Sequence, residues 1–343
     1  MTVTDLTNTT LADIARELLS CDSIAITGHV GPDGDCVGSQ LALGLALKEK
    51  GKHVIQLLAE DAPLNASLAW LPGADEMIFS GDYDAYLQEN PNKVPDAFVT
   101  CDVGMLSRIG AGKDVYQRIK KHITIDHHAI DTCISDFNYV DPDAPATCIL
   151  IGEVIDNLGQ AWTPDAATCC YCGLSTDTGS FCYQNTTPES FSFAIRMIES
   201  GADPATIATN VYQSRSLASL KLEQATISNM HVSDDGLWAY SFVDKKTLTE
   251  VGGTKFDTDT LVDKLRCLEG TQVVCMLRED EPHSIRGSFR AKNDQMDVSV
   301  VAQKFNGGGH KAAAGFTYKG SLDAACKAVA AELENLVKGF AKA

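Results

Sequence analysis

The sequence lacks the features of a membrane protein, a secreted protein or a protein that coats long nucleic acid. No apolar run approaches the roughly 18 to 20 residues that a membrane helix needs, and residues 1–20 lack the basic start and apolar core of a secretory signal. Basic residues are scarce, with 28 Lys and Arg against 46 Asp and Glu, for a formal net charge of −18. Because long duplex nucleic acid binds to basic surface, we expect neither it nor a membrane among the partners. We expect a cytoplasmic protein.

The twelve cysteines also lack the spacing of a disulfide framework or a zinc site. Most of them lie inside apolar segments, where a free cysteine behaves as a small hydrophobic residue. The densest group, "TCCYC" at 168–172, has no second half elsewhere in the chain that would complete a zinc site. We therefore expect buried, reduced thiols.

Strand-like and helix-like segments alternate along the first half of the chain, after a first helix that Thr10 is expected to cap. Short apolar runs rich in β-branched residues predict strands, and longer apolar runs predict helices. The predicted strands are 23–28, 53–59, 96–102 and 122–126, and the predicted helices are 37–50, 147–159 and 163–175. This order is typical of an α/β fold with a doubly wound, mainly parallel sheet.

The second half predicts a smaller α/β domain after a helical, more polar stretch. We predict a metal-binding catalytic domain at 1–187, a helical connector at 188–225 and a substrate-binding domain at 226–343, with a cleft between the two domains. The strands expected in the second domain are 237–243, 271–278 and 284–291, and the helices are 258–268, 297–305 and 321–340.

Carboxylates and imidazoles follow four separate segments of the first half. Ligands of open α/β sheets collect at the carboxyl ends of the strands, so these groups should meet at one edge. They are His29, Asp33, Asp35, Asp102, Asp126, His127, His128 and Asp177. Acids gathered in this way repel one another unless cations separate them, and the number of groups is enough for two. Oxygen and nitrogen donors without a thiolate favour manganese or magnesium over structural zinc, and paired cations of this kind serve phosphoryl chemistry.

Simpler readings of the "GPDGDCVG" segment explain only part of this set. An EF-hand loop fails because Val37 and Gly44 stand at its fifth and twelfth positions. A phosphate-binding P-loop would need a Gly-Lys-Ser/Thr sequence, which is absent. Either Asp33 or Asp35 alone could simply cap the helix that follows, but capping does not account for the acids and imidazoles of the other segments.

The motifs "GHVGPDGD", "TCDVG", "DHH" and "STDTGSF" together resemble the four motifs of the DHH phosphoesterase superfamily, in the order usual for that family. The stretch "GGGHKAAAGF" (307–316) resembles the signature of the C-terminal domain associated with it. A two-domain chain of this length is similar to the small members of the family. These are oligoribonucleases that also dephosphorylate 3′-phosphoadenosine 5′-phosphate (PAP), and relatives that hydrolyse cyclic dinucleotides.

The resemblance implies a role for each residue of the motifs. Two divalent cations are implied, Mn²⁺ in the first place, with Mg²⁺ or Co²⁺ as alternatives. The resemblance assigns one cation to His29, Asp33 and Asp102, and the second to Asp35, Asp102, His127 and Asp177. Asp126 would then orient an imidazole. His128 would contact the scissile phosphate or act as the general acid.

In the second domain, the candidate substrate-binding residues surround a glycine cluster. The residues "RGSFRAK" place Arg286, Arg290 and Lys292 at alternating positions, which would put them on one face of a strand. Three glycines in a row let backbone N–H groups approach a phosphate closely, although a flexible turn or a solvated strand face would explain them as well. The candidates are Arg286, Arg290, Lys292, Gly307, Gly308, Gly309 and His310, with Arg266 and Lys311 as weaker ones.

The leading hypothesis is a metal-dependent phosphoesterase that hydrolyses short oligoribonucleotides to 5′-mononucleotides and also removes the 3′-phosphate of PAP. The alternative is a phosphodiesterase for cyclic di-AMP or its linear product, because the motifs are shared. A type II pyrophosphatase is ranked lower, since it lacks the GGGH signature. A nucleotide sensor that binds without turnover should lack at least one metal ligand, and no motif position departs from the family pattern. A metal-buffering protein would not need the basic strand face near Arg290. The sequence leaves a homodimer open.

Overall fold

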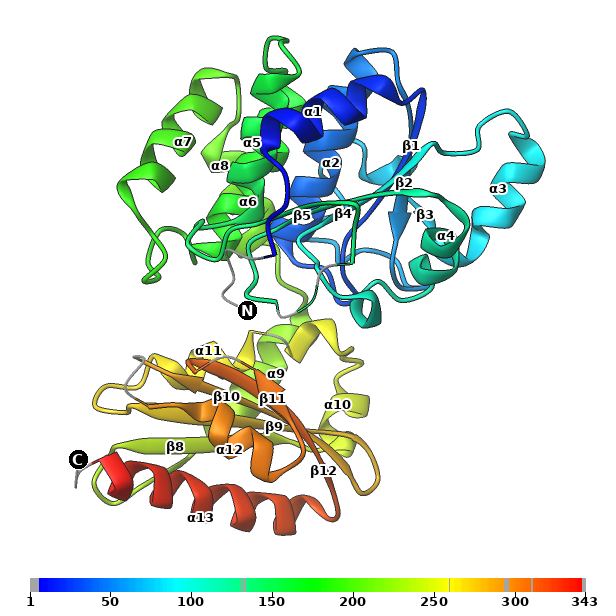
Figure 1. The fold of residues 1–343 in the computed structure, drawn as a ribbon. Helices are drawn as coiled ribbons and strands as arrows, with labels where there is room; N and C mark the ends of the chain where they lie inside the picture. The colour runs from blue at the N-terminus through cyan, green and yellow to red at the C-terminus, as the bar shows by residue number, and fades with distance from the viewer. Residues whose placement is uncertain are drawn as a thin grey trace. The chain divides into compact units, whose positions relative to one another are not determined.

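The computed structural model describes residues 6–130, 132, 134–258, 260–292, 296–309 and 311–340. They form two compact units, Met1–Ser214 and Arg215–Ala343 (Figure 1). The predicted α/β architecture is confirmed in both, since each unit combines one six-stranded sheet with helices.

The first unit contains a six-stranded sheet in which all strands are parallel, in the order β3-β2-β1-β4-β5-β6. Its strands are β1 (Ser23–Thr27), β2 (His53–Leu58), β3 (Ile78–Phe79), β4 (Ala97–Cys101), β5 (Lys121–Asp126) and β6 (Phe137–Val140). Its helices are α1 (Leu11–Ser20), α2 (Gly34–Glu49), α3 (Tyr83–Glu89), α4 (Gly112–Arg118), α5 (Thr147–Asn157), α6 (Pro164–Asp177), α7 (Pro188–Glu199) and α8 (Pro204–Tyr212), with short 3₁₀ turns η2 (Ala74–Glu76), η3 (Ser80–Asp82) and η4 (Leu106–Arg108).

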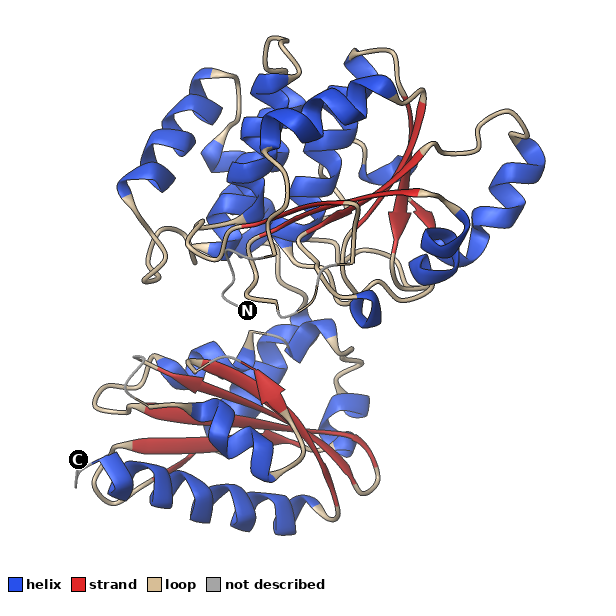
Figure 2. Ribbon diagram, viewed as in Figure 1, coloured by secondary structure: helices blue, strands red, loops and turns tan. Residues whose placement is uncertain are grey.

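Helices cover both faces of this sheet (Figures 1 and 2). Helices α1, α2, α5 and α6 share the larger core on one face, and α3 and α4 pack on the other. Helix α2 is buried on nearly all sides, as expected for a sequence that is apolar all round. It approaches α6 so closely that a Cβ on Gly38 would lie 2.4 Å from the carbonyl oxygen of Cys169. Glycine at this position therefore sets the spacing of the two helices.

The second unit contains a mixed sheet in the order β11-β12-β10-β9-β8-β7, in which only β8 and β9 are parallel. Its strands are β7 (His231–Val232), β8 (Trp238–Val243), β9 (Val273–Glu281), β10 (Ser284–Ala291), β11 (Gly308–Gly309) and β12 (Ala313–Lys319). Its helices are α9 (Leu217–Ser228), α10 (Lys245–Glu250), α11 (Leu261–Arg266), α12 (Val298–Lys304) and α13 (Leu322–Phe340), with a 3₁₀ turn η5 (Phe256–Thr258). Helices α12 and α13 pack on one face, and α9 and α11 on the other.

The predicted strands and helices of both halves are present, and the side chain of Thr10 caps α1 as expected. Not predicted from the sequence were β6, β12, the two-residue strands β3, β7 and β11, and the short helices α3, α4 and α10. Strand β6 has only four residues, and β12 begins with the small residues Ala-Ala-Gly, so neither shows a clear alternation. The stretch 188–225, predicted as a connector, forms three helices, of which α7 and α8 belong to the first unit and α9 to the second.

The cysteines within the described residues agree with the expectation of reduced thiols. All cysteines that the sequence places in apolar runs are buried and free, whereas Cys182 and Cys267 are free and exposed. Across the described ranges, no helix has both the length and the apolar character needed to cross a membrane.

Candidate metal centre

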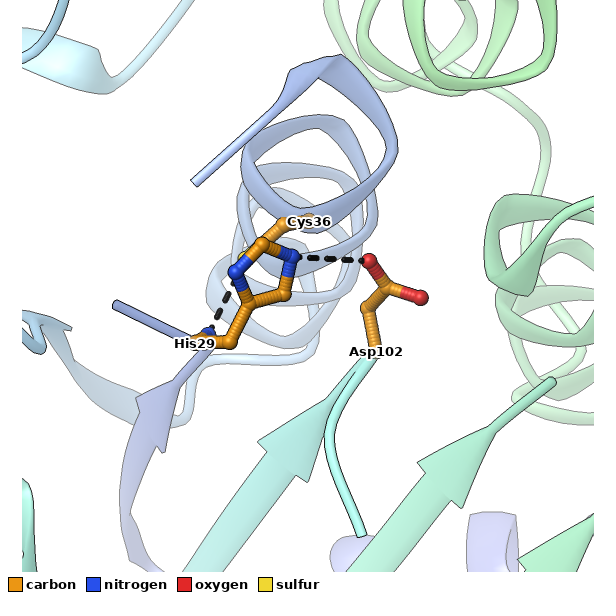
Figure 3. Close-up of side chains that lie close together, drawn as sticks. All are labelled: His29, Cys36 and Asp102. Carbon is orange, nitrogen blue, oxygen red and sulfur yellow. Dashed lines mark hydrogen bonds and ion pairs between the residues drawn. The ribbon is translucent and has the colours of Figure 1, made fainter. Parts of the chain in front are cut away.

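The strand order of the first sheet reverses between β1 and β4, which lie side by side. Such a reversal opens a crevice at the carboxyl ends of the strands, where ligands of α/β proteins bind. His29 follows β1 and Asp102 follows β4, and Nε2 of His29 lies 3.4 Å from Oδ2 of Asp102 (Figure 3). Asp102 has a φ of 62°, in the left-handed region that residues other than glycine seldom adopt. Strain of this kind is concentrated at functional sites.

His127, which follows β5, occupies the other side of Asp102. Its Nε2 lies 3.6 Å from Oδ1 of Asp102, 3.6 Å from Oδ2 of Asp177 and 4.0 Å from Oδ2 of Asp35. Its Nδ1 lies 3.1 Å from the carbonyl oxygen of Ala144. Because a carbonyl oxygen can only accept, Nδ1 carries a proton, so in the neutral imidazole it is Nε2 that offers a lone pair on the side of the three carboxylates. This is the tautomer that a metal-binding histidine adopts.

The carboxylate of Asp35 is fully buried and is held by the first turn of α5. The backbone N–H groups of Thr147 and Cys148 donate to its two oxygens at 2.6 and 2.9 Å. The hydroxyl of Thr147 also donates to Oδ1 of Asp102 at 2.9 Å. A helix N-terminus stabilises negative charge, so α5 supports two buried acids of the cluster, Asp35 and Asp102. Thr147 was not among the residues predicted from the sequence.

Asp126 and His128 form a separate pair at the edge of the cluster. Oδ1 of Asp126 lies 2.8 Å from Nδ1 of His128 and accepts from its backbone N–H at 3.0 Å. Nδ1 of His128 also lies 3.4 Å from Oδ1 of Asp102. The other oxygen of Asp126 is buried and has no hydrogen-bond partner among the described residues. Asp126 therefore fixes the orientation of His128.

Three groups of possible donor atoms result, and within each group the atoms lie within 4.8 Å of one another. The groups are His29, Cys36 and Asp102; Asp102, His127 and His128; and Asp35, His127 and Asp177. Asp102 belongs to two of them, and its bridging position stays a prediction. The thiol of Cys36 was not anticipated beside these donors. It accepts the backbone N–H of His29 at 3.2 Å, and Figure 3 shows it on the first turn of α2, next to the imidazole ring.

Asp33 stands apart from these three groups. It is exposed, and its Oδ1 accepts the backbone N–H groups of Asp35 and Cys36, so it is the N-cap of α2. Capping was one of the two roles considered for it, and its role as a metal ligand stays a prediction. Asp177 ends α6 and is followed by Gly179, Ser180 and Phe181 with φ values of 55°, 56° and 63°. This left-handed turn after Asp177 is a second point of backbone strain at the cluster.

Burial and mutual repulsion shift the pKa values of these acids in different directions. Burial, and then the charges of Asp102 and Asp177, raise the pKa of Asp35 well above its usual value. Burial also raises the pKa of Asp177, to about 6; His127 opposes this shift, and Asp33 and Asp102 add to it. Burial would raise the pKa of Asp102 as well, but its interactions with His128 and His29 lower it instead. Burial and mutual repulsion thus oppose full ionisation of Asp35 and Asp177 in the absence of a cation.

The donor set fits divalent cations. Buried carboxylates need compensating positive charge, and no Lys or Arg forms a described ion pair with Asp35, Asp102 or Asp177. Carboxylate oxygen and imidazole nitrogen are the donors preferred by metals such as Mn²⁺.

Comparison with known proteins agrees with this chemistry. Residues 23–174 match the N-terminal domain of the DHH family, and residues 238–335 match the DHHA1 domain. The bifunctional oligoribonuclease and PAP phosphatase NrnA of Thermus thermophilus is 33% identical over 308 residues, which cover 89% of this chain and 87% of that protein. The chain belongs to the DHH family. It is therefore a phosphoesterase, a hydrolase that acts on phosphate ester bonds.

Two further relatives extend the similarity over almost the whole chain. The NrnA of Bacillus subtilis, described by the same name, is 29% identical over 330 residues, or 95% of this chain and 98% of that protein. A crystal structure of an exopolyphosphatase-related protein from Bacteroides fragilis superposes with a TM-score of 0.86 at 27% identity, covering 96% of this chain and 97% of that one. Both units of this DHH protein therefore have counterparts in single relatives.

The second unit places most of the predicted substrate-binding residues on or beside its sheet. Arg286 and Arg290 lie on the same face of β10, opposite the buried Ile285 and Phe289. Lys292 does not share this strand face, because β10 ends one residue before it, and its ammonium donates to the carbonyl oxygen of Leu268 at 2.6 Å. Only the two arginines therefore form the basic strand face that the alternation predicts.

The glycine cluster is extended rather than a simple turn. Gly308 and Gly309 form β11, which pairs with β12, and a Cβ on Gly307 would lie 2.2 Å from the carbonyl oxygen of Gly315. His310, the histidine of the GGGH signature, lies outside the described residues. Of the weaker candidates, Arg266 lies 3.9 Å from the carboxylate of Asp263, and Lys311 is exposed.

Proposed function

We propose that this DHH protein hydrolyses short oligoribonucleotides to 5′-mononucleotides and removes the 3′-phosphate of PAP, with Mn²⁺ as its metal. The observation that supports it is the cluster of acids and imidazoles at the switch point of the first sheet, with Asp102 shared between two donor groups. The name of the two NrnA relatives combines the same two activities.

In this proposal, two cations are held by the groups that the motifs predict. One is assigned to His29, Asp33 and Asp102, and the other to Asp35, Asp102, His127 and Asp177. Bound there, the cations supply a water molecule of lowered pKa and positive charge near the phosphate. The chain itself fixes the donors: Ala144 sets the tautomer of His127, and the first turn of α5 sets the position of Asp35.

His128 is the proposed proton donor. Burial would lower the pKa of His128, but hydrogen bonds with Asp102 and Asp126 raise it to about 10. These two carboxylates favour the protonated form of the imidazole. A protonated imidazole beside the cluster can give its proton to the leaving oxygen as the ester bond breaks.

In the second unit, Arg286 and Arg290 are the proposed contacts for a further phosphate of the nucleotide. Arginine presents a planar set of donors that suits phosphate oxygens. Six of the nine arginines of the chain form described ion pairs with carboxylates, but Arg286 and Arg290 do not. We expect their replacement by alanine to raise KM more than it lowers kcat.

The test is product analysis with Mn²⁺ on pApA, a five-nucleotide RNA, PAP and cyclic di-AMP in parallel. We expect AMP from pApA and from PAP, with little attack on cyclic di-AMP, and no products from an Asp177→Ala protein. A preference for cyclic di-AMP would assign the chain to cyclic dinucleotide turnover instead. No reaction with any of the four, although Mn²⁺ is bound, would refute the proposal.

A further inference from the structure

Arg108 stands beside the metal centre although no motif considered above includes it as a ligand. It is the last residue of η4, in the loop that Asp102 begins. Its carbonyl oxygen accepts the backbone N–H of Val30 at 2.7 Å, which ties this loop to the loop that carries His29. Its Nη2 lies 3.2 Å from Nδ1 of His29. A half-buried guanidinium thus touches the imidazole whose Nε2 faces Asp102.

The contact between Arg108 and His29 is a hydrogen bond only if Nδ1 of His29 carries no proton. Nδ1 of His29 also lies 3.0 Å from the carbonyl oxygen of Val30. If Nδ1 donates to this oxygen, the lone pair of Nε2 points to the Asp102 side, as metal binding requires. In that tautomer Nδ1 carries a hydrogen and cannot accept one from Arg108. The N–H groups on this side of the guanidinium are then available to water or to a ligand.

The charge balance around Arg108 is unusual for this chain. The other arginines of the first unit form ion pairs: Arg16 with Asp13, Arg118 with Asp84 and Arg196 with Asp156. No ion pair with a carboxylate is found for Arg108 within the described ranges, in a chain with 46 acidic residues against 28 basic ones. It shares this property only with the two arginines of β10 that are proposed to bind phosphate. An arginine that is kept apart from carboxylates next to an acidic cluster is well placed to bind an anionic ligand.

We propose that Arg108 binds the phosphate group that is cleaved, by donating to its non-bridging oxygens on the His29 side of the cluster. The inference rests on the phosphoesterase function proposed above and adds a catalytic residue to it. The guanidinium would counter the negative charge that develops on these oxygens in the transition state, and groups of this kind contribute factors of about 10² to 10³ to kcat. The competing role is structural, in which Arg108 only holds His29 in place for metal binding.

Variants at Arg108 distinguish the two roles, with Arg118→Gln as the matched control in the same unit. The probe is inorganic phosphate, titrated calorimetrically into Mn²⁺-loaded protein, and Mn²⁺ affinity is measured separately by the electron paramagnetic resonance of the free ion. For Arg108→Gln we expect phosphate binding to weaken at least about tenfold and kcat on pApA to fall about 10²- to 10³-fold. Its Mn²⁺ affinity should stay unchanged, and Arg108→Lys should be intermediate.

Two results would overturn the inference. One is unchanged phosphate binding in Arg108→Gln, and the other is a parallel loss of Mn²⁺ affinity, which would show the structural role. The wild-type protein is measured first, so that the two proposals fail separately. If it neither binds Mn²⁺ nor cleaves pApA, the proposed function itself is wrong, whatever the variants show.

Discussion

Divalent cations should stabilise the first unit and leave the second unchanged. The first unit holds all three donor groups, and its buried acids repel one another until a cation separates them. A ligand present at 100 times its dissociation constant stabilises the folded state by about 2.7 kcal/mol per site. For a unit of 214 residues, about 2 to 4 °C per kcal/mol gives a rise in Tm of roughly 5 to 11 °C per occupied site.

The assay is calorimetry in EDTA and in Mn²⁺, combined with hydrogen exchange followed peptide by peptide. We expect added Mn²⁺ to slow exchange in β1 and β4 of the first sheet, whereas β9 and β10 of the second sheet keep their rates. His127→Ala serves as the control, because it removes the imidazole that faces three of the carboxylates. Equal protection of both sheets, or a full Tm shift in His127→Ala, would refute the reasoning.

Three further predictions concern the acids and the packing beneath them. In EDTA, the free energy of unfolding should fall as the pH rises from about 4 to 6. The reason is that the folded pKa of Asp177 is raised from 3.8 to about 6, so the folded state holds an extra proton in that pH range. A free energy of unfolding that does not change with pH in denaturant titrations would contradict this. Gly38→Ala should cost about 1 to 3 kcal/mol in the same titrations, since its Cβ would meet the carbonyl of Cys169, whereas Gly339→Ala meets no atom within 4 Å and should be neutral. Asp126→Asn should lower kcat about 10- to 100-fold with the bound Mn²⁺ unchanged, and a loss of metal would assign it a different role.

The positions of the motif residues could be predicted because each follows a strand or helix that the sequence marks clearly. Runs such as 23–28 and 96–102 are mostly apolar and β-branched in their interiors, so they predict buried parallel strands, and the carboxyl ends of such strands share an edge. The proximity of His29 and Asp102 could therefore be predicted without knowing the strand order. The reversal between β1 and β4, which brings them to neighbouring strands, is visible only in the structure.

The supporting contacts were not predictable, because they join residues far apart in the sequence. Thr147 lies 112 positions after Asp35. Although a helix was predicted to start at Thr147, nothing in the sequence indicated whether its N-terminus would bind Asp33 or Asp35. Local pattern could not decide which of Asp33 and Asp35 caps α2 either, since both residue types suit an N-cap. The structure gives Asp33 the cap, and the α5 N-terminus holds Asp35 instead. Arg108 was missed for the same reason, because only tertiary contact brings it to His29.

The features of this site that lower the stability of the fold are the same features that the proposed chemistry requires. Asp35 and Asp102 are buried beside each other, and Asp102 also adopts a left-handed backbone conformation. Each of these features destabilises an isolated fold, and the first turn of α5 offsets only part of the cost by donating to both acids. The remaining imbalance favours a ligand that brings positive charge. A cluster that holds cations attracts a phosphate, and Arg108 is placed to bind it. Its guanidinium lies beside His29 and, among the described arginines of the first unit, it alone forms no ion pair with a carboxylate.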